Sequence, residues 1–578
     1  MSRVTIQHSY NELPANAVSA VPAPLDEVIS VLVILRRTTH EGMTVRDYAD
    51  GLIAGTITKY LTREELDQMF GTEDADMNLA ISFFQSNGIN VDFSNTMTAE
   101  IRCSGTIAQF NEAFDTTIME VDTTERVHIS YSGELTIPAE LDGIIETVFD
   151  LETSGQLVSS YSYGDSGGLY ALDPANEHGL PVADGVTPAA VTGLVPSQVA
   201  TAYRFPSTSN GNGQCICIPE FGGGYTANDL TANGITNTVV DVSVSGGINN
   251  TNFADSGNLN SSVEVMLDIY CAGLAAPKSK LAMYFAPNSL AAFVTVLTTA
   301  AADTTNCPSA ISFSWVAVES SWVSTGYYNS MESAMASCVA LGITVFCAAG
   351  DWGPRGQPAA AVSTCCYPAA SPYCVGCGGT TLELVSGTNA IQSEVVWGGN
   401  TSSSATGGGI SAYATVPTFQ SGLTSKTNLG VTASLPNRGV PDIGGNADGN
   451  SGYTYYLGNA QYYVSNVGGT SATAPIMAAM IVRINQLKQS FSGLPLSSWY
   501  GNISTGFNDI TSGNNATTTT INYAYVATSG WDACTGLGSP KADVLYGLTK
   551  KGVTFPKSNF GFRRTGTLAY PRVQRPTN

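Results

Sequence analysis

Histidine is scarce in this chain of 578 residues, and the last 400 residues contain none. The four histidines are His8, His40, His128 and His178. A nucleophilic serine usually transfers its proton to an imidazole. Any such serine after residue 178 therefore needs a base of another kind.

Long hydrophobic runs are also missing. No apolar run approaches the ~20 residues that a membrane span needs, and the first 27 residues lack the apolar core of a signal peptide. The run "VISVLVIL" at 28–35 is too short and too late for either, and it reads as a buried strand. We therefore expect no membrane partner and find no signal peptide.

Basic residues are few in the first third of the chain. Residues 1–189 hold 29 acidic and 8 basic side chains, a net charge of −21, whereas residues 190–578 hold 17 and 16, a net charge of −1. The acidic block argues against nucleic acid as a partner. The uneven charge also predicts two parts with different roles.

The twelve cysteines are too few for a disulfide scaffold in a chain of this length. Cys365, Cys366, Cys374 and Cys377 cluster, and "CVGC" has a spacing that zinc sites use. The surrounding "SPYCVGCGGT" is more typical of a buried strand, in which cysteine packs as a small hydrophobe. We favour packing over zinc, with room for one or two disulfides.

The length predicts two or three domains. Residues 28–152 alternate short strands and helices, including a helix opened by a capping box at Thr62 and Glu65, which favours an α+β sandwich of the ferredoxin-like kind. Residues 153–190 are rich in Ser, Gly, Pro and Ala and read as an exposed linker. Residues 549–578 carry seven basic and no acidic side chains and read as a basic tail.

Residues 191–548 contain apolar strands that alternate with helical segments. The strands are expected at "CICIPE", "TVVDVSV", "KLAMYFA", "AISFSW" and "ITVFCAAG". Continuous apolar strands between helices predict a doubly wound, mostly parallel sheet. The active site of such a sheet lies outside the carboxyl ends of its strands.

The stretch "GDSGG" at 164–168 matches the serine motif of chymotrypsin-like enzymes. It lies in the expected linker, without the two-barrel pattern or the preceding histidine motif of those enzymes. We do not expect it to be catalytic.

The stretch "VGGTSATAPIMAAM" at 467–480 presents Ser471 after a glycine turn, at the start of a helix of small residues. Glycine allows a substrate backbone to approach closely. The helix N-terminus directs N–H groups and a positive dipole end at a developing oxyanion. A subtilisin-like fold presents its nucleophile in this way, which makes Ser471 the candidate.

Without histidine, the base is expected to be a carboxylate. In "SSVEVMLDIYCAG", Glu264 and Asp268 stand four residues apart, on one face of a mostly apolar helix. Two acids close together cannot both ionise easily, so one becomes a proton carrier. Asp351 in "VFCAAGDWG" follows an apolar strand, and when protonated it can donate a hydrogen bond to an oxyanion. Each pattern alone is more often a solvated helix face or a turn.

Taken together, "SSVEVMLD", "SFSW", "AAGDWG" and "GGTSATAP", in this order, resemble the sedolisin family of serine-carboxyl peptidases. So do "EFGGGY" at 220–225, "RGVPDI" at 438–443 and "DIT…GWDACTGLGSP" at 509–540. The resemblance covers roughly residues 190–548 and implies a subtilisin-like α/β fold. The acidic residues 1–152 look like the activation propeptide of that family.

The resemblance implies roles for the four candidate residues. Ser471 would be the nucleophile, Glu264 its general base, and Asp268 the acid that supports Glu264. Asp351 would donate to the oxyanion together with the backbone N–H of Ser471. A carboxylate base has a pKa near ~4–5, and Asp351 must stay protonated, so the family pattern implies action in acid.

Further positions add to this pattern. Glu220 and Trp315 match residues that extend the hydrogen-bond network around Glu264 in some family members. Trp352 departs from the family pattern, in which smaller or polar residues are more usual, and we expect it to narrow a substrate subsite.

The segment near the end of the domain resembles the family's calcium site, which holds one structural ion. Its ligands would be the two carboxylates and three carbonyl groups of Asp509, Ile510, Thr528, Gly530 and Asp532. Such all-oxygen ligation suits a hard cation. Without the resemblance, we would interpret the same residues as two turn aspartates in a loop rich in Gly and Thr.

The leading hypothesis is an acid-acting endopeptidase, made as an inactive monomeric precursor, with peptides or proteins as substrates and its own propeptide as inhibitor. A tripeptidyl exopeptidase of the same family and a catalytically silent structural member are the alternatives. The presence of all four candidate residues argues against a catalytically silent protein. The chemistry favours an extracellular or acidic compartment. Because the propeptide needs ionised carboxylates for salt bridges or caps that dock it, we expect acid to loosen it.

Overall fold

The computed structural model describes residues 2–172 and 193–548, apart from positions 8, 125, 154, 156, 324–326, 357–363, 400–402 and 521. The expected basic tail, the second half of the expected linker and two of the histidines lie outside the described residues.

The first part of the chain folds around a four-stranded antiparallel sheet. Its strands are β3 (Val28–Leu35), β4 (Asn90–Asn95), β5 (Glu100–Thr106) and β9 (Ile145–Phe149), in the order β4-β5-β3-β9. Helices α3 (Asp74–Ser86) and α4 (Ile107–Phe114) share one apolar core with this sheet. The β-α-β-β-α-β order is that of the ferredoxin-like sandwich, and it confirms the expected fold.

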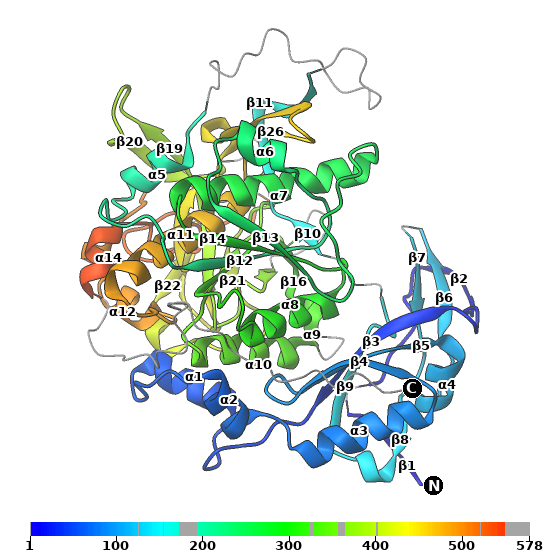
Figure 1. The fold of residues 1–578 in the computed structure, drawn as a ribbon. Coiled ribbons are helices and arrows are strands. Elements are labelled where there is room, and N and C mark those ends of the chain that lie inside the picture. The colour runs from blue at the N-terminus through cyan, green and yellow to red at the C-terminus, as the bar shows by residue number, and fades with distance from the viewer. Residues whose placement is uncertain are drawn as a thin grey trace, which may run out of the picture.

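Two further helices of the first part lie against the second part. These helices are α1 (Val45–Ala54) and α2 (Arg63–Phe70), and α1 packs on α10 (Tyr327–Ala340) (Figure 1). Between α1 and α2, the N–H of Leu61 donates a hydrogen bond of 2.8 Å to the carbonyl of Ala340. The first part is therefore docked through its own helices.

Local sequence determines where α1 and α2 begin. The Thr62 hydroxyl accepts a hydrogen bond from the N–H of Glu65, whose carboxylate accepts one from the N–H of Thr62. This is the capping box expected at α2. Thr44 and Asp47 form a second box at α1. Both helices thus depend on a carboxylate at their first turn.

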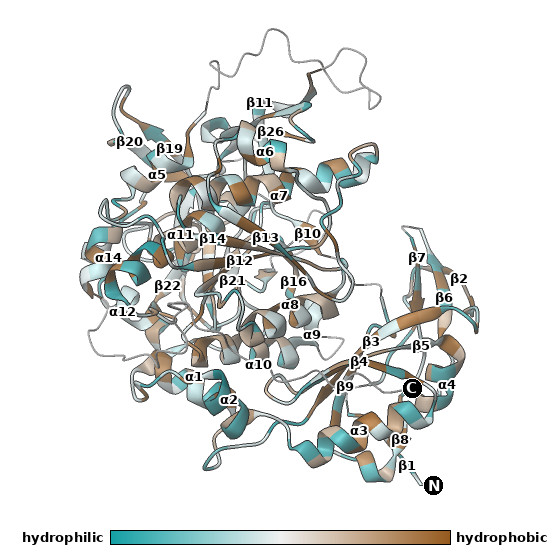
Figure 2. Cartoon of the chain, in the orientation of Figure 1, coloured by the Kyte–Doolittle hydropathy of each residue, from teal (hydrophilic) through white to brown (hydrophobic). Residues whose placement is uncertain are grey.

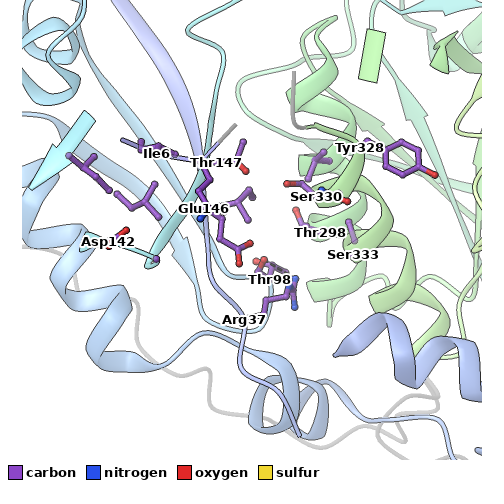
Figure 3. A pocket seen from close by; sticks show the side chains of 18 of the residues that line it. Ile6, Arg37, Thr98, Asp142, Glu146, Thr147, Thr298, Tyr328, Ser330 and Ser333 are labelled. Atoms are coloured by element: carbon purple, nitrogen blue, oxygen red, sulfur yellow. Dashed lines mark hydrogen bonds between the residues drawn. The ribbon is translucent and has the colours of Figure 1, made fainter. Parts of the chain in front are cut away.

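A cavity with both polar and apolar lining residues lies between the first part and the helices on which it docks. It has a volume of about 820 Å³. Arg37 and Glu146 line it from the first part, whereas Thr298 of helix α8 (Leu290–Ala302) and Ser330 of α10 face them (Figure 3). The docking interface is therefore partly hollow, with polar side chains on both sides of the hollow.

The second part is built on an eight-stranded sheet. Its order is β13-β14-β12-β15-β17-β19-β20, and β25 pairs with β19. These pairs are parallel except for β19 with β20. The strands are β12 (Cys215–Glu220), β13 (Thr238–Ser243), β14 (Lys280–Phe285), β15 (Ala310–Phe313), β17 (Thr344–Ala348), β19 (Val375–Leu384), β20 (Ile391–Val396) and β25 (Ile443–Asn446). The predicted doubly wound, mostly parallel sheet is confirmed.

Helices cover both faces of this sheet. Helices α7 (Ser256–Ala275) and α11 (Thr470–Lys488) lie on one face, and α8 and α10 lie on the other (Figure 1). The central strands are accordingly hydrophobic (Figure 2). In the part of the chain that the structure describes, no helix combines the length and the apolar character needed to cross a membrane.

The expectation of an exposed linker does not hold for its described half. Strand β10 (Val158–Ser159) pairs with β16 (Trp315–Val318), and β11 (Ser162–Ala171) pairs with β27 (Tyr462–Gly468). Ser160, between β10 and β11, is fully buried. Its backbone groups find partners in the second part, which a composition rich in Ser and Gly does not reveal. The "GDSGG" stretch belongs to β11.

The clustered cysteines are buried, as we expected for small hydrophobic residues in a buried strand. Cys365, Cys374 and Cys377 lie in the main hydrophobic core, and all four residues of the cluster are buried and carry free thiols.

Candidate active site

Ser471 lies in the first turn of α11, directly after a sharp glycine turn. Gly469 has a φ of 106°. A Cβ atom added there would lie 2.2 Å from the carbonyl oxygen of Ser160 and 2.5 Å from Oδ2 of Asp351. Only glycine lets the chain pass so close to both oxygens. The helix start thus places Ser471 beside Asp351.

Asp351 follows β17, and its carboxyl group faces the start of α11. Its Oδ1 accepts hydrogen bonds from the N–H of Thr470 at 2.8 Å and from the hydroxyl of Thr470 at 2.9 Å. Among the described residues, Oδ2 has no hydrogen-bond partner. Burial raises the pKa of Asp351 to about 8, although the two bonds from Thr470 act against this rise. Asp351 therefore keeps its proton at acid and neutral pH and can donate it in a hydrogen bond.

Helix α7 carries Glu264 and Asp268, both fully buried. The hydroxyl of Ser471 lies close enough to Glu264 to lower the pKa of that carboxyl, although neither oxygen of Glu264 has a hydrogen bond of ordinary geometry to a described residue. Ser314 connects these groups. Its hydroxyl donates to Oδ1 of Asp268 at 2.7 Å, and its carbonyl accepts a hydrogen bond of 3.3 Å from Oγ of Ser471.

Glu220, the last residue of β12, extends the cluster. Its Oε2 accepts a hydrogen bond of 3.0 Å from Nε1 of Trp315, and both side chains are buried. Burial raises the pKa of Glu220, Glu264 and Asp268 well above the ordinary range. The charge of Asp268 raises the pKa of Glu220 and Glu264 further.

The three buried carboxyls form one coupled unit. Because each ionisation opposes the next, the three carboxyls together hold their protons more tightly than separate carboxyls would. Such a unit can accept a proton from Ser471 and return it. The N–H of Ser471 and the carboxyl of Asp351 can meanwhile stabilise an oxyanion. The arrangement has the parts for acyl transfer without histidine.

The chain itself crosses this site in an extended form. The N–H of Ser160 donates to the carbonyl of Ser314 at 3.0 Å, and the carbonyl of Ser160 accepts from the N–H of Ser471 at 3.0 Å. Before Ser160 the chain pairs with β16, and after it the chain pairs with β27. The candidate site is therefore filled by the segment that follows the first part.

Side chains hold this segment on both sides of the site. The amide of Asn288 accepts a hydrogen bond of 2.8 Å from the N–H of Leu157 and donates one of 3.1 Å to its carbonyl. The hydroxyl of Tyr161 donates to the carbonyl of Asn260 in α7 at 3.4 Å. Burial, and then the charge of Glu264, raises the pKa of Tyr161 to about 12. Tyr161 therefore lies beside the carboxyl cluster.

The expected calcium ligands gather in one loop region. The N–H of Gly530 donates to both oxygens of Asp509, and Oδ2 of Asp532 accepts a hydrogen bond from the N–H of Thr528. The carbonyls of Ile510, Thr528 and Gly530 accept no hydrogen bond from the described residues. No group of three or more His, Cys, Asp or Glu side chains in the described ranges has metal-binding geometry, so carbonyls must complete the shell. Two carboxylates and these carbonyls fit a hard cation.

Three residues at the site were missed by sequence reasoning. Ser314 lies inside "SFSW" and Thr470 precedes Ser471, so their motifs were the available signal. No signal in the sequence pointed to Asn288, because its contact with Leu157 joins residues that are 131 positions apart.

Known proteins resemble this chain along most of its length. Residues 15–154 match the family model of the pro-kumamolisin activation domain. Kumamolisin from Bacillus sp. (strain MN-32) is 34% identical over 542 residues, which cover 92% of this chain and 93% of that protein. A tripeptidyl-peptidase of Aspergillus fumigatus is 22% identical over 83% of this chain and 86% of its own. The solved structure of Pseudomonas sedolisin, a serine-carboxyl proteinase complexed with two molecules of pseudo-iodotyrostatin, matches with a TM-score of 0.53 and 26% identity. It covers 62% of this chain and 98% of that chain.

Proposed function

Because this chain belongs to the sedolisin family of serine-carboxyl peptidases, we propose that it is an acid-acting endopeptidase made as an inactive precursor. The observation that carries the proposal is the cluster of three buried carboxyls beside Ser471. Such a cluster can take the role that an imidazole has in other serine peptidases.

In the proposed reaction, Oγ of Ser471 attacks the carbonyl carbon of a substrate peptide bond. Glu264 takes the hydroxyl proton and later gives it to the leaving amine. Asp268 supports Glu264 as a proton reservoir, and Ser314 fixes its orientation. Glu220 and Trp315 extend this network.

The oxyanion that forms is stabilised by the N–H of Ser471 and by the protonated carboxyl of Asp351. Oδ2 of Asp351 supports this role, because it has no hydrogen-bond partner in the part of the chain that the structure describes. Burial raises the pKa of Asp351 to about 8, so this donor is present in acid and also at neutral pH. The proposed action in acid therefore rests on the resemblance to the family and not on the titration of Asp351.

The extended segment supports the endopeptidase over the tripeptidyl alternative. In an exopeptidase, the substrate cleft is closed a few subsites away from the catalytic serine, so that only the end of a chain fits there. Here an uninterrupted chain is bound on both sides of Ser471, from Leu157 through β11. The same occupancy supports the role of the first part as an inhibitor, since the segment attaches it to the site.

We also propose that one calcium ion is held by the carboxylates of Asp509 and Asp532 with the carbonyls of Ile510, Thr528 and Gly530. A bound ion would join two loops of the second part and balance the charge of the two carboxylates. It would stabilise the fold without taking part in the chemistry.

The test is to incubate a denatured protein with the acid-treated precursor and to identify the products by mass spectrometry. We expect internal fragments of many lengths, and none from the Ser471→Ala variant. A ladder of tripeptides would establish the exopeptidase alternative, and an unchanged substrate would establish a silent protein. Gel filtration checks the expected monomer.

A further inference from the structure

We propose that Thr470 is a positioning residue that keeps the proton of Asp351 on Oδ2, the carboxyl oxygen left free for the substrate. This inference rests on the proposed function, because it takes Asp351 as a donor to the oxyanion. It goes further by naming the residue that decides which of the two oxygens of Asp351 donates. Thr470 acts through Asp351 and is not itself a donor to the oxyanion.

Two donors of Thr470 converge on one oxygen of Asp351. The N–H of Thr470 donates to Oδ1 at 2.8 Å, and the hydroxyl of Thr470 donates to the same atom at 2.9 Å. A carboxyl oxygen has two lone pairs, so an oxygen that accepts both of these bonds has none left for a proton. The proton of Asp351 is therefore excluded from Oδ1 and resides on Oδ2.

The backbone fixes the direction in which the Thr470 hydroxyl donates. The N–H of Gly350, directly before Asp351, donates to Oγ1 of Thr470 at 3.0 Å. This bond occupies a lone pair of the hydroxyl, whose single proton is directed at Oδ1 of Asp351. The three groups thus join the end of β17 to the start of α11, and Thr470 is fully buried between them.

Oδ2 of Asp351 lies beside the position of a substrate carbonyl. It has no hydrogen-bond partner among the residues that the structure describes. A Cβ atom added to Gly469 would lie 2.5 Å from Oδ2 and 2.2 Å from the carbonyl oxygen of Ser160. That carbonyl accepts the N–H of Ser471 at 3.0 Å, as a substrate carbonyl would. A proton on Oδ2 is therefore available to the oxyanion, whereas a proton on Oδ1 would be directed at α11.

Other titratable groups near Asp351 do not bind its oxygens. The charge of Asp351 acts on Glu264 in α7 and on the thiol of Cys366 in β18 (Cys366–Tyr367). The thiol of Cys366 donates to a backbone carbonyl at 3.0 Å. Glu264 has no hydrogen bond of ordinary geometry to a described residue. Within the described ranges, Thr470 is therefore the residue that distinguishes Oδ1 from Oδ2.

The same hydroxyl affects the pH at which Asp351 loses its proton. Burial raises the pKa of Asp351 to about 8, and the two hydrogen bonds from Thr470 act against this rise because they favour the ionised carboxylate. Removal of the hydroxyl should raise this pKa further. A variant without the hydroxyl should then keep its protonated donor to a higher pH than the wild type, an effect that a residue that merely fills space would not have.

The test compares Thr470→Val, which replaces the hydroxyl by a methyl group, with Thr470→Ser, which keeps the hydroxyl. Each full-length precursor is processed with immobilised wild-type enzyme, which is removed before hydrolysis of a denatured protein is measured from pH 3 to 9. We expect Thr470→Val to lower kcat in acid about tenfold, less than the ~10²–10³-fold cost of removing a donor outright. Its rate relative to the wild type should rise above pH 7. Thr470→Ser should follow the wild type throughout.

Two controls separate this role from a loss of packing. Thr473→Val removes another buried hydroxyl of α11, which donates to the carbonyl of Gly445 at 3.3 Å, and it should keep the rate and profile of the wild type. In the Asp351→Ala background, Thr470→Val should cause no further loss, because Thr470 acts through Asp351. A further tenfold loss in that background overturns the proposal. So does a rate of Thr470→Val that stays in constant proportion to the wild type at every pH.

The outcomes also distinguish this inference from the proposed function. If the wild type hydrolyses the substrate and Thr470→Val does so at the same rate across the pH range, only the role of Thr470 is rejected. If the wild type hydrolyses no substrate at any pH, the proposed function itself is rejected.

Discussion

The backbone N–H of Ser471 donates a hydrogen bond of 3.0 Å to the carbonyl oxygen of Ser160. The donor stands at the start of α11, and the acceptor belongs to the segment that follows the activation part. The precursor therefore fills its own candidate site in the manner of a substrate. A foreign peptide cannot reach this N–H until the segment leaves.

Glu264→Gln and Asp268→Asn should each lower kcat/KM at least ~10²-fold, the scale of general acid–base contributions. Each replacement keeps the shape of the side chain but removes a group that can exchange the proton of Ser471. The measurement is hydrolysis of a protein substrate at acid pH. Glu332→Gln is the matched control, because Glu332 is also fully buried but is bonded to Tyr367 outside the cluster. Near-full activity of Glu264→Gln would refute the carboxylate base.

Asp351→Asn and Asp351→Ala should differ in their response to pH. Burial raises the pKa of Asp351 to about 8, so the wild type loses its donor as the pH rises through that value. Asparagine donates at every pH, and this variant should keep part of the activity and lose less of it above neutrality. Alanine donates nothing and should cost ~10²–10³-fold in kcat. The measurement is the hydrolysis rate of each variant as a function of pH from 3 to 9. If Asp351→Ala were as active as the wild type, Asp351 would not be part of the oxyanion hole.

The sheet could be predicted from the sequence because its strands are marked by their own residues. In "CICIPE" and "ITVFCAAG" the apolar runs are long enough to show burial on both faces, and all residues of β12 and β17 are buried. Glu220 and Asp351 come at the ends of these runs, so their place beside one edge of the sheet followed from the strand direction.

The segment that fills the site could not be predicted in the same way. "LVSSYSYGDSGG" has the composition of a loop, and its strand character depends on partners far along the chain. Ser160 is bonded to Ser314 and Ser471, and neither contact has a local signature. The roles of Ser314 and Asn288 became visible only once this segment was in place.

Chelation of calcium should lower the melting temperature of the wild type but not that of Asp532→Ala. An ion that binds only the folded state raises stability by mass action, by about 2.7 kcal/mol at a hundredfold excess over Kd. The measurement is thermal unfolding with calcium or with chelator. Asp543→Ala is the control, because Asp543 pairs with Arg204 on the surface and should leave the response to chelator intact. The same response in Asp532→Ala as in the wild type would place the ion elsewhere.

Trp352→Ala should relax the preference for the residue two positions before Ser160. Val158 and Trp352 pack against one small buried cluster, formed by Val316, Ala348 and Cys366. A peptide copied from the segment should lose about tenfold in affinity for the variant, the scale of burying one valine. A peptide with alanine in place of Val158 is the control and should lose much less. Equal losses for the two peptides would show that Trp352 does not line this subsite.

Two groups of carboxyls should respond to acid with opposite signs. The side chain and N–H of Thr44 lower the pKa of Asp47, and Lys59 and the N–H of Thr62 lower the pKa of Glu65. The stability that such carboxylates add is present above their unfolded pKa and is lost as the pH falls through the folded value. The raised pKa of the active-site carboxyls has the reverse effect, because their contribution is greatest in acid and declines as the pH rises towards the folded value.

Acid should therefore loosen the activation part while the peptidase part stays folded. Asp47 and Glu65 cap α1 and α2, and α1 packs on α10. The double variant Asp47→Asn, Glu65→Gln keeps weaker caps and lacks the charge at the helix N-termini. It should release activity at a pH about half a unit above that of the wild type. The measurement is the midpoint of activity released from the full-length precursor across pH 3 to 7. Asp26→Asn, at an exposed carboxylate of the same part, should leave the midpoint unchanged. If the double variant also keeps the wild-type midpoint, these two caps do not control the release of the activation part, and other carboxylates must govern its response to acid.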